Sequence, residues 1–196
     1  MAELTSILAG APPVSERLLD ELARRAGEES LLDVAVGEVD APFGRLAVAI
    51  TERGLVRVGF DSDEVALDVA NRLSPRVLRA PRRVDPVRRQ LDDYLAGRRH
   101  DFDVPLDWSL ARSDFQRRIL TAATAIPYGE VRTYSDVARD AGNDRAVRAA
   151  GSALGANPLC VVVPCHRVVR VGGGLGGYAG GADVKAWLLE LEGSAS

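Results

Sequence analysis

Apolar and polar residues alternate in three short runs in the N-terminal part of the chain. The runs fall at 32–36, 46–50 and 56–60, with Gly44 and Gly54 between them. Alternation with a period of two places every second side chain on one face of a β-strand, and a short glycine-containing connection joins antiparallel neighbours. The pattern therefore predicts an antiparallel meander of three strands.

Helical spacing of apolar residues occurs before and after this meander. We expect one amphipathic helix to begin at Ser15 and two more to lie at 63–73 and 85–95. Apolar residues at intervals of three and four lie on one face of a helix, which can then pack on a sheet. The sequence thus predicts a small α+β domain, 31–106, that follows a partly helical N-terminal extension, 1–30.

From about residue 107 the pattern becomes mostly helical. An apolar periodic run follows Ser113, a good helix cap, and two short helices are expected at 133–140 and 144–154 with Ala-Gly-Asn between them. Two helices joined by a few residues that include glycine form a helix-turn-helix. We therefore predict a C-terminal domain, 107–196, with a helix-turn-helix, and an α+β class for the whole chain.

Three further segments complete the predicted C-terminal domain. The valines at 161–163 predict a short strand, a glycine-rich loop runs over 172–181, and a last helix is expected at 183–192. Glycine permits positive φ and close approach of the backbone, so the loop is able to wrap a planar ligand. A phosphate-binding loop is disfavoured, because no Lys-Ser or Lys-Thr pair follows and no strand-to-helix G-x-G-x-x-G pattern is present.

Composition narrows the class of protein. The chain has 196 residues, 46% hydrophobic and 27% charged, and no apolar run approaches the roughly 20 residues of a membrane helix. With no secretory leader and only two cysteines, we expect a cytoplasmic protein without a disulfide framework. Two cysteines and two histidines build no zinc site of known spacing, so neither a metal nor a cofactor is expected.

Charge gives weak guidance about partners. The net charge is −3, which is not that of a strongly basic nucleic-acid-binding protein, although residues 112–193 carry a slight basic excess. Arginines also cluster over 79–99, where a solvated face is favoured over contact with DNA or a neighbouring molecule. Any DNA binding must therefore come from a local face.

Cys165 and His166 carry the clearest chemistry. A histidine beside a thiol can remove its proton, and the thiolate is the reactive nucleophile. A Cys-His pair by itself is more often a buried core cysteine beside a structural histidine, and that alternative stays open at this point. Glu192, on the predicted last helix, is a carboxylate that can orient His166 as the third member of a relay, although a glutamate there is usually only solvated.

Five segments of the C-terminal half carry a family resemblance. They are Ile-Pro-Tyr-Gly-Glu-Val at 126–131, Tyr134, Asn-Pro at 157–158, Val-Pro-Cys-His-Arg-Val-Val at 163–169 and Gly-Tyr at 177–178. Over residues 115–193 the chain closely resembles the O6-alkylguanine-DNA alkyltransferases, whereas the N-terminal half resembles that family only in size and in its strand-rich start. This resemblance implies a DNA repair protein that binds the minor groove of duplex DNA, flips out O6-alkylguanine and takes the alkyl group irreversibly onto Cys165.

The resemblance also implies a role for each matched position. Cys165 is expected to accept the alkyl group, His166 to be the water-linked base, and Glu192 to orient His166. Tyr134 is expected to rotate the target nucleotide and to donate a hydrogen bond to the guanine, and Asn157 to bridge the helix-turn-helix to the segment before Cys165. The expected DNA-binding residues besides Tyr134 are Arg148, which would fill the place of the base, and the small residues Ala149, Gly151, Ser152 and Ala153. The expected pocket residues are Tyr178, Ala179, Gly180 and Val168.

Two positions depart from the pattern of the family. Ala179 stands where a serine often follows the pocket tyrosine, so one hydroxyl contact to the guanine is missing unless a backbone amide replaces it. Cys160 stands where some relatives have proline, and a core thiol is its favoured interpretation. The sequence leaves open the preference for bulky alkyl groups or O4-alkylthymine and the role of the N-terminal extension.

Other function classes fit less well. A cysteine hydrolase normally brings its histidine from elsewhere in the chain, and a transcription regulator usually has a polar recognition helix for the major groove. A non-catalytic, lesion-sensing or regulatory DNA-binding protein of the same fold is the remaining alternative. The expected partner is double-stranded DNA that contains O6-alkylguanine; we expect a monomer, and cooperative assembly on DNA stays open.

Overall fold

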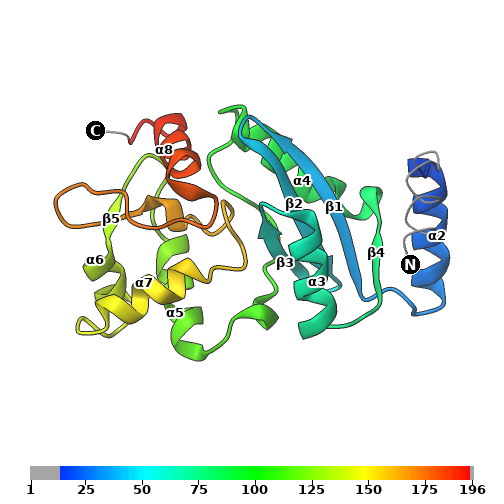
Figure 1. Cartoon of the computed structure of the whole chain (residues 1–196), viewed down its shortest axis with the longest axis horizontal. Coiled ribbons are helices and arrows are strands. Elements are labelled where there is room, and N and C mark those ends of the chain that lie inside the picture. Colours follow the sequence, from blue (N-terminus) through cyan, green and yellow to red (C-terminus); the bar gives the residue numbers. More distant parts are fainter. Residues whose placement is uncertain (1–13, 195–196) are drawn as a thin grey trace, which may run out of the picture.

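The computed structural model describes residues 14–194. Residues 1–13, the first part of the expected N-terminal extension, and residues 195–196 lie outside this range. The described chain forms a sheet domain at one end and a mostly helical C-terminal half at the other, with helix α2 (Glu16–Glu28) outermost beyond the sheet (Figure 1). The predicted α+β class is confirmed, and none of the helices in the described range combines the length and apolar character that a membrane crossing needs.

Three strands form the predicted antiparallel meander. These are β1 (Val34–Ala41), β2 (Gly44–Thr51) and β3 (Gly54–Gly59). A fourth strand, β4 (Val77–Arg79), pairs in parallel with β1 and gives the order β3-β2-β1-β4. The sequence did not predict β4, because three residues are too few to show an alternating pattern.

Helices cover both faces of this sheet. Leu46 and Val48 of β2 share a core with α4 (Pro81–Leu95), whereas Ala47 shares a separate core with α3 (Ser62–Arg72). Successive side chains of a strand point to opposite faces, so β2 is buried on both. The core under α4 continues into the C-terminal half, and this continuity fixes α4 against the elements that carry Cys165.

The starts of α4 and α2 can be compared with their predicted positions. Helix α4 begins four residues before the prediction, since proline is tolerated in the first turn of a helix. Helix α2 (Glu16–Glu28) is capped by Ser15, whose side chain accepts from the backbone N–H of Leu18, as its sequence pattern predicts. It buries Ala23 and Ala26 against the outer edge of the sheet domain.

The C-terminal half contains the predicted helix-turn-helix. Ser113 caps α5 (Asp114–Thr124), which packs against the helix pair α6 (Tyr134–Asp140) and α7 (Val147–Gly155). Helix α8 (Gly181–Leu191) closes this half near the C-terminal end (Figure 1). The short strands β5 (Arg132–Thr133) and β6 (Val168–Val169) pair in parallel, and a 3-10 turn, η1 (Trp108–Leu110), follows the connection from the sheet domain.

The predicted strand at 161–163 is wrong. This segment is a turn, in which the N–H of Val162 donates to the carbonyl of Cys160 at 2.9 Å and that of Val163 to the carbonyl of Leu159 at 2.8 Å. Val161 has a φ of 71°, a left-handed conformation that costs a β-branched residue roughly 1–3 kcal/mol. The run of valines correctly indicated burial, but apolar character alone does not distinguish an extended segment from a buried turn.

Candidate active site

Cys165 begins a short 3-10 turn, η2 (Cys165–Arg167), and is 5% exposed. Its Sγ accepts a hydrogen bond from Nδ2 of Asn157 at 3.1 Å, and the same amide donates to the carbonyl of Val163 at 3.0 Å. Oδ1 of Asn157 accepts from the backbone N–H of Leu159 at 2.9 Å. Because Asn157 lies two residues after the end of α7, it joins the end of the helix-turn-helix to the turn that precedes the thiol.

The two cysteines differ in how readily they ionise. The nearby Cys160 thiol, the Asn157 amide and the charge of Lys185 lower the pKa of Cys165, although burial opposes them. The neighbouring Cys165 and burial raise the pKa of Cys160 well above its ordinary value, so the thiol that accepts from the Asn157 amide, Cys165, is the one favoured as a thiolate. Lys185 is itself buried, where its Nζ donates to the carbonyls of Val168 and Leu175, and burial lowers its pKa to about 8.

His166 and Glu192 form a buried pair beside the thiol. Nε2 of His166 lies 2.9 Å from Oε1 of Glu192, and neither side chain is exposed to solvent. Burial lowers the pKa of His166, although Glu192 opposes this shift. Burial alone would raise the pKa of Glu192, but hydrogen bonds from His166 and Arg167 outweigh it and lower the pKa to about 2. At neutral pH the pair is a neutral imidazole against an ionised carboxylate.

The free ring nitrogen of His166 is the one suited to take a proton. The bond to Glu192 assigns the hydrogen to Nε2, so Nδ1 carries the lone pair. Within residues 14–194, Nδ1 makes no hydrogen bond. A neutral imidazole with a free lone pair next to a thiol can act as its general base.

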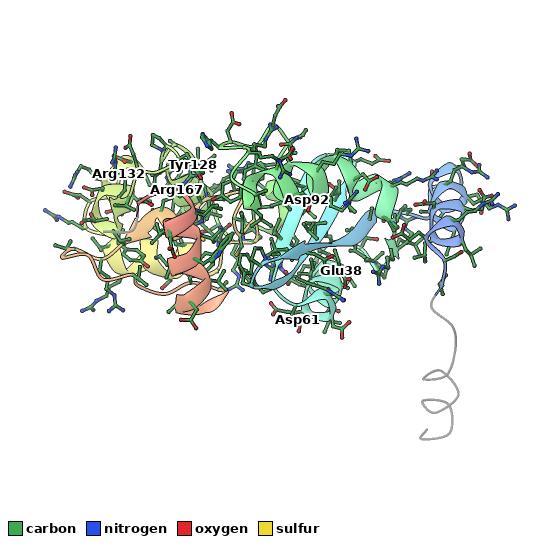
Figure 2. The ribbon with its side chains drawn as sticks, turned by 90° about the horizontal axis from the view of Figure 1, so that it is seen from above. Glu38, Asp61, Asp92, Tyr128, Arg132 and Arg167 are labelled. Atoms are coloured by element: carbon green, nitrogen blue, oxygen red, sulfur yellow. The ribbon has the colours of Figure 1, made fainter. Side chains whose placement is uncertain are left out.

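Glu192 is held by more groups than the sequence indicated. Nε and Nη2 of Arg167 each approach a carboxylate oxygen at 2.9 Å, and the backbone N–H of Gly129 donates to Oε2 at 3.2 Å. The hydroxyl of Tyr94 donates to Oε1. Figure 2 shows Arg167 beside Tyr128 near α8, with the guanidinium carbon 5.8 Å from the ring centroid. Sequence reasoning assigned no role to Arg167 or Tyr94; Arg167 at least follows the Cys-His pair, whereas nothing along the sequence signals Tyr94.

A pocket of about 520 Å³ opens between α7 and the glycine-rich loop. Tyr134 stands in its wall at the start of α6, where Thr133 and Asp136 form a capping box that fixes the first turn. Burial and the neighbouring Cys165 raise the pKa of Tyr134, and burial and both cysteines raise the pKa of Tyr178. The ring of Tyr178 lies 6.2 Å from that of His166 between centroids, so this wall of the pocket adjoins the residue that follows the thiol. The lining residues are Tyr134, Val147, Arg148, Gly151, Gly155, Arg170, Gly177, Tyr178 and Ala179.

The residues expected on the DNA-facing helix divide between its two faces. Arg148, Ala149 and Ser152 are exposed on α7, and Gly151 is half-buried beside Tyr134. Ala153 is only 8% exposed, because it borders the buried side of the helix, where its carbonyl accepts from Nε2 of Gln116 on α5 at 3.1 Å. The expectation that Ala153 contacts DNA is therefore corrected.

Two residues expected in the pocket also lie away from it. Val168 is wholly buried in the core and its carbonyl accepts from Lys185, so it does not line the pocket. Gly180 lies against Phe60 of the sheet domain, and a Cβ at this position would come within 2.6 Å of the ring. Gly180 therefore serves the contact between the loop and Phe60. Within residues 14–194, no three His, Cys, Asp or Glu side chains gather as metal ligands would.

Comparison with known proteins agrees with this geometry. Residues 114–194 match the family model described as "6-O-methylguanine DNA methyltransferase, DNA binding domain", and residues 35–108 match "6-O-methylguanine DNA methyltransferase, ribonuclease-like domain". The crystal structure of Mycobacterium tuberculosis OGT in complex with DNA superposes with a TM-score of 0.71 at 38% identity, covering 83% of this chain and 94% of that one.

Relatives are similar over most of their length. A methylated-DNA–protein-cysteine methyltransferase of Methanosarcina acetivorans is 39% identical over 155 residues, which are 79% of this chain and 96% of the relative. The inducible methylated-DNA–protein-cysteine methyltransferase of Bacillus subtilis is 40% identical over 153 residues, which are 76% of this chain and 84% of the relative. The chain therefore belongs to the 6-O-methylguanine DNA methyltransferase family.

Proposed function

We propose that this protein repairs DNA by direct reversal, taking the alkyl group of an O6-alkylated guanine onto Cys165 once per molecule. Membership of the family and the DNA complex of a relative 38% identical support a DNA-binding alkyltransferase. The observation that carries the chemistry is a thiol held by Asn157, next to the His166–Glu192 pair and beside the pocket walled by Tyr134. This combination gives a nucleophile, a general base for its proton and a pocket for the flipped nucleobase.

The exposed face of α7 is suited to the minor groove. Ala149 and Ser152 are small and exposed, so the backbone of the helix can approach a narrow groove closely. Arg148 is exposed on the same helix and lines the pocket, which suits it to fill the gap that a flipped base leaves. Extruding a base costs a few kcal/mol, and less where pairing is already damaged, as it is at an O6-alkylated guanine.

Alkyl transfer is a displacement at the alkyl carbon. Cys165 gives its proton to Nδ1 of His166 through a bridging water, and the thiolate attacks. A carbon–sulfur bond forms while the bond from carbon to O6 breaks, and the electron pair of that bond leaves with the guanine. Tyr134 donates a hydrogen bond to the departing guanine, which takes up one proton to balance the one that Cys165 lost. The carbon–sulfur bond of the resulting thioether is not readily broken, so the thiol is not regenerated.

The stoichiometry of repair tests this function. A duplex with one O6-methylguanine, in molar excess over the protein, is followed for the appearance of restored guanine. We expect the amount restored to reach a plateau at one guanine per protein, and to be nil with Cys165→Ser. A wild-type protein that binds the duplex and restores no guanine would instead be a lesion-sensing protein of the same fold.

A further inference from the structure

Tyr94 brings a hydroxyl from the sheet domain to the His166–Glu192 pair. It lies on α4, is 0% exposed, and packs its ring against Phe102 at 5.1 Å and Tyr128 at 6.1 Å between centroids. Its hydroxyl donates to Oε1 of Glu192 and lies 3.3 Å from Nε2 of His166. Among residues 14–106, only this side chain hydrogen-bonds to the pair.

We propose that Tyr94 is a positioning residue for alkyl transfer, which fixes the carboxylate of Glu192 and holds His166 in the tautomer with its hydrogen on Nε2. The proposal rests on the function proposed above, because the tautomer matters only if Nδ1 takes the proton of Cys165.

The count of hydrogens at this junction determines the tautomer. The carboxylate of Glu192 is ionised and its Oε1 can only accept hydrogen bonds, so the O–H of Tyr94 must point toward this oxygen. The remaining lone pairs of the Tyr94 oxygen then face Nε2 of His166 at 3.3 Å. If Nε2 carried only a lone pair, it would be repelled by the lone pairs of two oxygen atoms, the Tyr94 hydroxyl and Oε1 of Glu192. If Nε2 carries a hydrogen, its N–H can donate to these oxygens. Nδ1 is consequently left as the basic nitrogen.

Tyr94 contributes something that the other donors to Glu192 do not. Arg167 and the backbone of Gly129 hold the carboxylate, but neither hydrogen-bonds to the ring of His166. Tyr94 contacts both members of the pair. Burial and the charge of Glu192 raise the pKa of Tyr94 far above its ordinary value, so its hydroxyl stays a donor throughout the physiological range.

The hydroxyl of Tyr94 also limits how far Glu192 raises the pKa of His166. Because Tyr94 and His166 share Oε1, each takes part of the negative charge on that oxygen. Without the hydroxyl, His166 shares this oxygen only with Arg167, and the pKa of His166 rises. Arg167 and Lys185, which oppose a positive charge on His166, are the same in both proteins. As the pH is lowered, the rate of transfer in the variant then begins to fall at a higher pH than in the wild type. The reason is that a protonated His166 cannot accept a proton from Cys165.

The test compares Tyr94→Phe with Tyr128→Phe in the full-length protein. Tyr128 is a matched control, because its hydroxyl donates to the backbone carbonyl of Leu191 at 2.9 Å and to no side chain of the pair. Single-turnover rates of methyl transfer are measured from a duplex with one O6-methylguanine as a function of pH, and duplex affinity is measured separately by fluorescence anisotropy.

We expect Tyr94→Phe to slow transfer about tenfold, as losing one hydrogen bond to a charged group does. Its acid limb should lie at higher pH than that of the wild type, with duplex affinity unchanged within twofold. Tyr128→Phe should keep the rate and the pH profile of the wild type. Equal rates in Tyr94→Phe and wild type, or equal losses in both variants, would overturn the positioning role, because the second result indicates only lost packing.

A measurement on the wild-type protein tests the proposal even if the Tyr94→Phe variant does not fold. Two-bond ¹H–¹⁵N correlation spectra report which ring nitrogen of His166 is protonated, without any DNA or alkyl transfer. The proposal requires Nε2–H in the wild type and, if Tyr94→Phe folds, a mixture of tautomers or an imidazolium there. A wild-type His166 with its hydrogen on Nδ1 would refute the proposal even if the protein repairs DNA, whereas failure to repair with Nε2–H intact would refute only the proposed function.

Discussion

The side-chain amide of Asn157 is hydrogen-bonded to the sulfur of Cys165, with Nδ2 and Sγ 3.1 Å apart. The same side chain bonds to the carbonyl of Val163 and to the N–H of Leu159. One residue therefore fixes both the nucleophile and the strained turn before it. Since Asn157 lies two residues after the end of α7, this contact links the helix-turn-helix to the thiol.

Asn157→Ala should impair both stability and transfer. The N–H of Leu159 would be buried without this partner, and the carbonyl of Val163 would keep only the N–H of Cys165, which should reduce the free energy of unfolding by about 1–3 kcal/mol. Loss of the donor should raise the pKa of Cys165 and slow transfer at neutral pH more than about tenfold. Urea denaturation and single-turnover rates measure the two effects.

The stability control for Asn157 is Asn143→Ala. Asn143 is exposed in the turn between α6 and α7, so its removal should change the unfolding free energy by less than about 0.5 kcal/mol. If the two alanine variants were equally stable, Asn157 would not hold the turn as the hydrogen bonds indicate.

Gly176 should be needed for the position of Tyr134. A Cβ at Gly176 would lie 2.5 Å from the hydroxyl of Tyr134, and the backbone there has a φ of 72°. Gly172 has a similar φ of 88° but open space around it. Alanine at either position should cost about 1–2 kcal/mol of stability from the left-handed backbone, but only Gly176→Ala should also displace Tyr134 and slow transfer. Similar transfer rates for the two variants, at comparable stability, would speak against a role for the Tyr134 hydroxyl.

Glu192 should make the stability depend on pH in acid. In the unfolded chain Glu192 takes up a proton near pH 4.5, whereas in the folded protein its pKa is lowered to about 2. Between these values the unfolded state binds more protons, so stability falls as pH falls through this window and is fully present above it. Urea denaturation from pH 6 to pH 3 should show a shallower decline in Glu192→Gln than in wild type. The comparison variant is Glu190→Gln, an exposed carboxylate of the same helix; an equal decline in both variants would contradict the account.

The sequence predicts those parts of the site that lie in contiguous motifs. Cys165 and His166 are adjacent, and the meander and the helix-turn-helix follow from periodicity and turn residues. Tyr94 could not be predicted, because it resembles any other apolar-face residue of α4 until the fold brings it to Glu192. Long-range contacts of this kind are fixed by tertiary packing, which local patterns do not contain.

The errors have equally specific causes. The three valines at 161–163 favour extended backbone and so predict a strand, whereas hydrogen bonds to Leu159 and Cys160 and burial in the core impose a turn. Ala153 is expected at the DNA-facing surface because the resemblance implies a helix of small residues in the minor groove, whereas in the structure it is only 8% exposed. Small size permits close approach to DNA and close packing against α5 alike, so composition does not tell which face is exposed.

The location of the transferred group tests the central claim most directly. The protein is incubated with a duplex that contains one O6-methylguanine, digested, and analysed by peptide mass spectrometry with fragmentation between Cys160 and Cys165. We predict a gain of one methylene on Cys165 alone, and no gain in Cys165→Ser. Methylation on Cys160, or unmodified cysteines in a protein that has bound the lesion, would contradict the assignment of Cys165 as the alkyl acceptor.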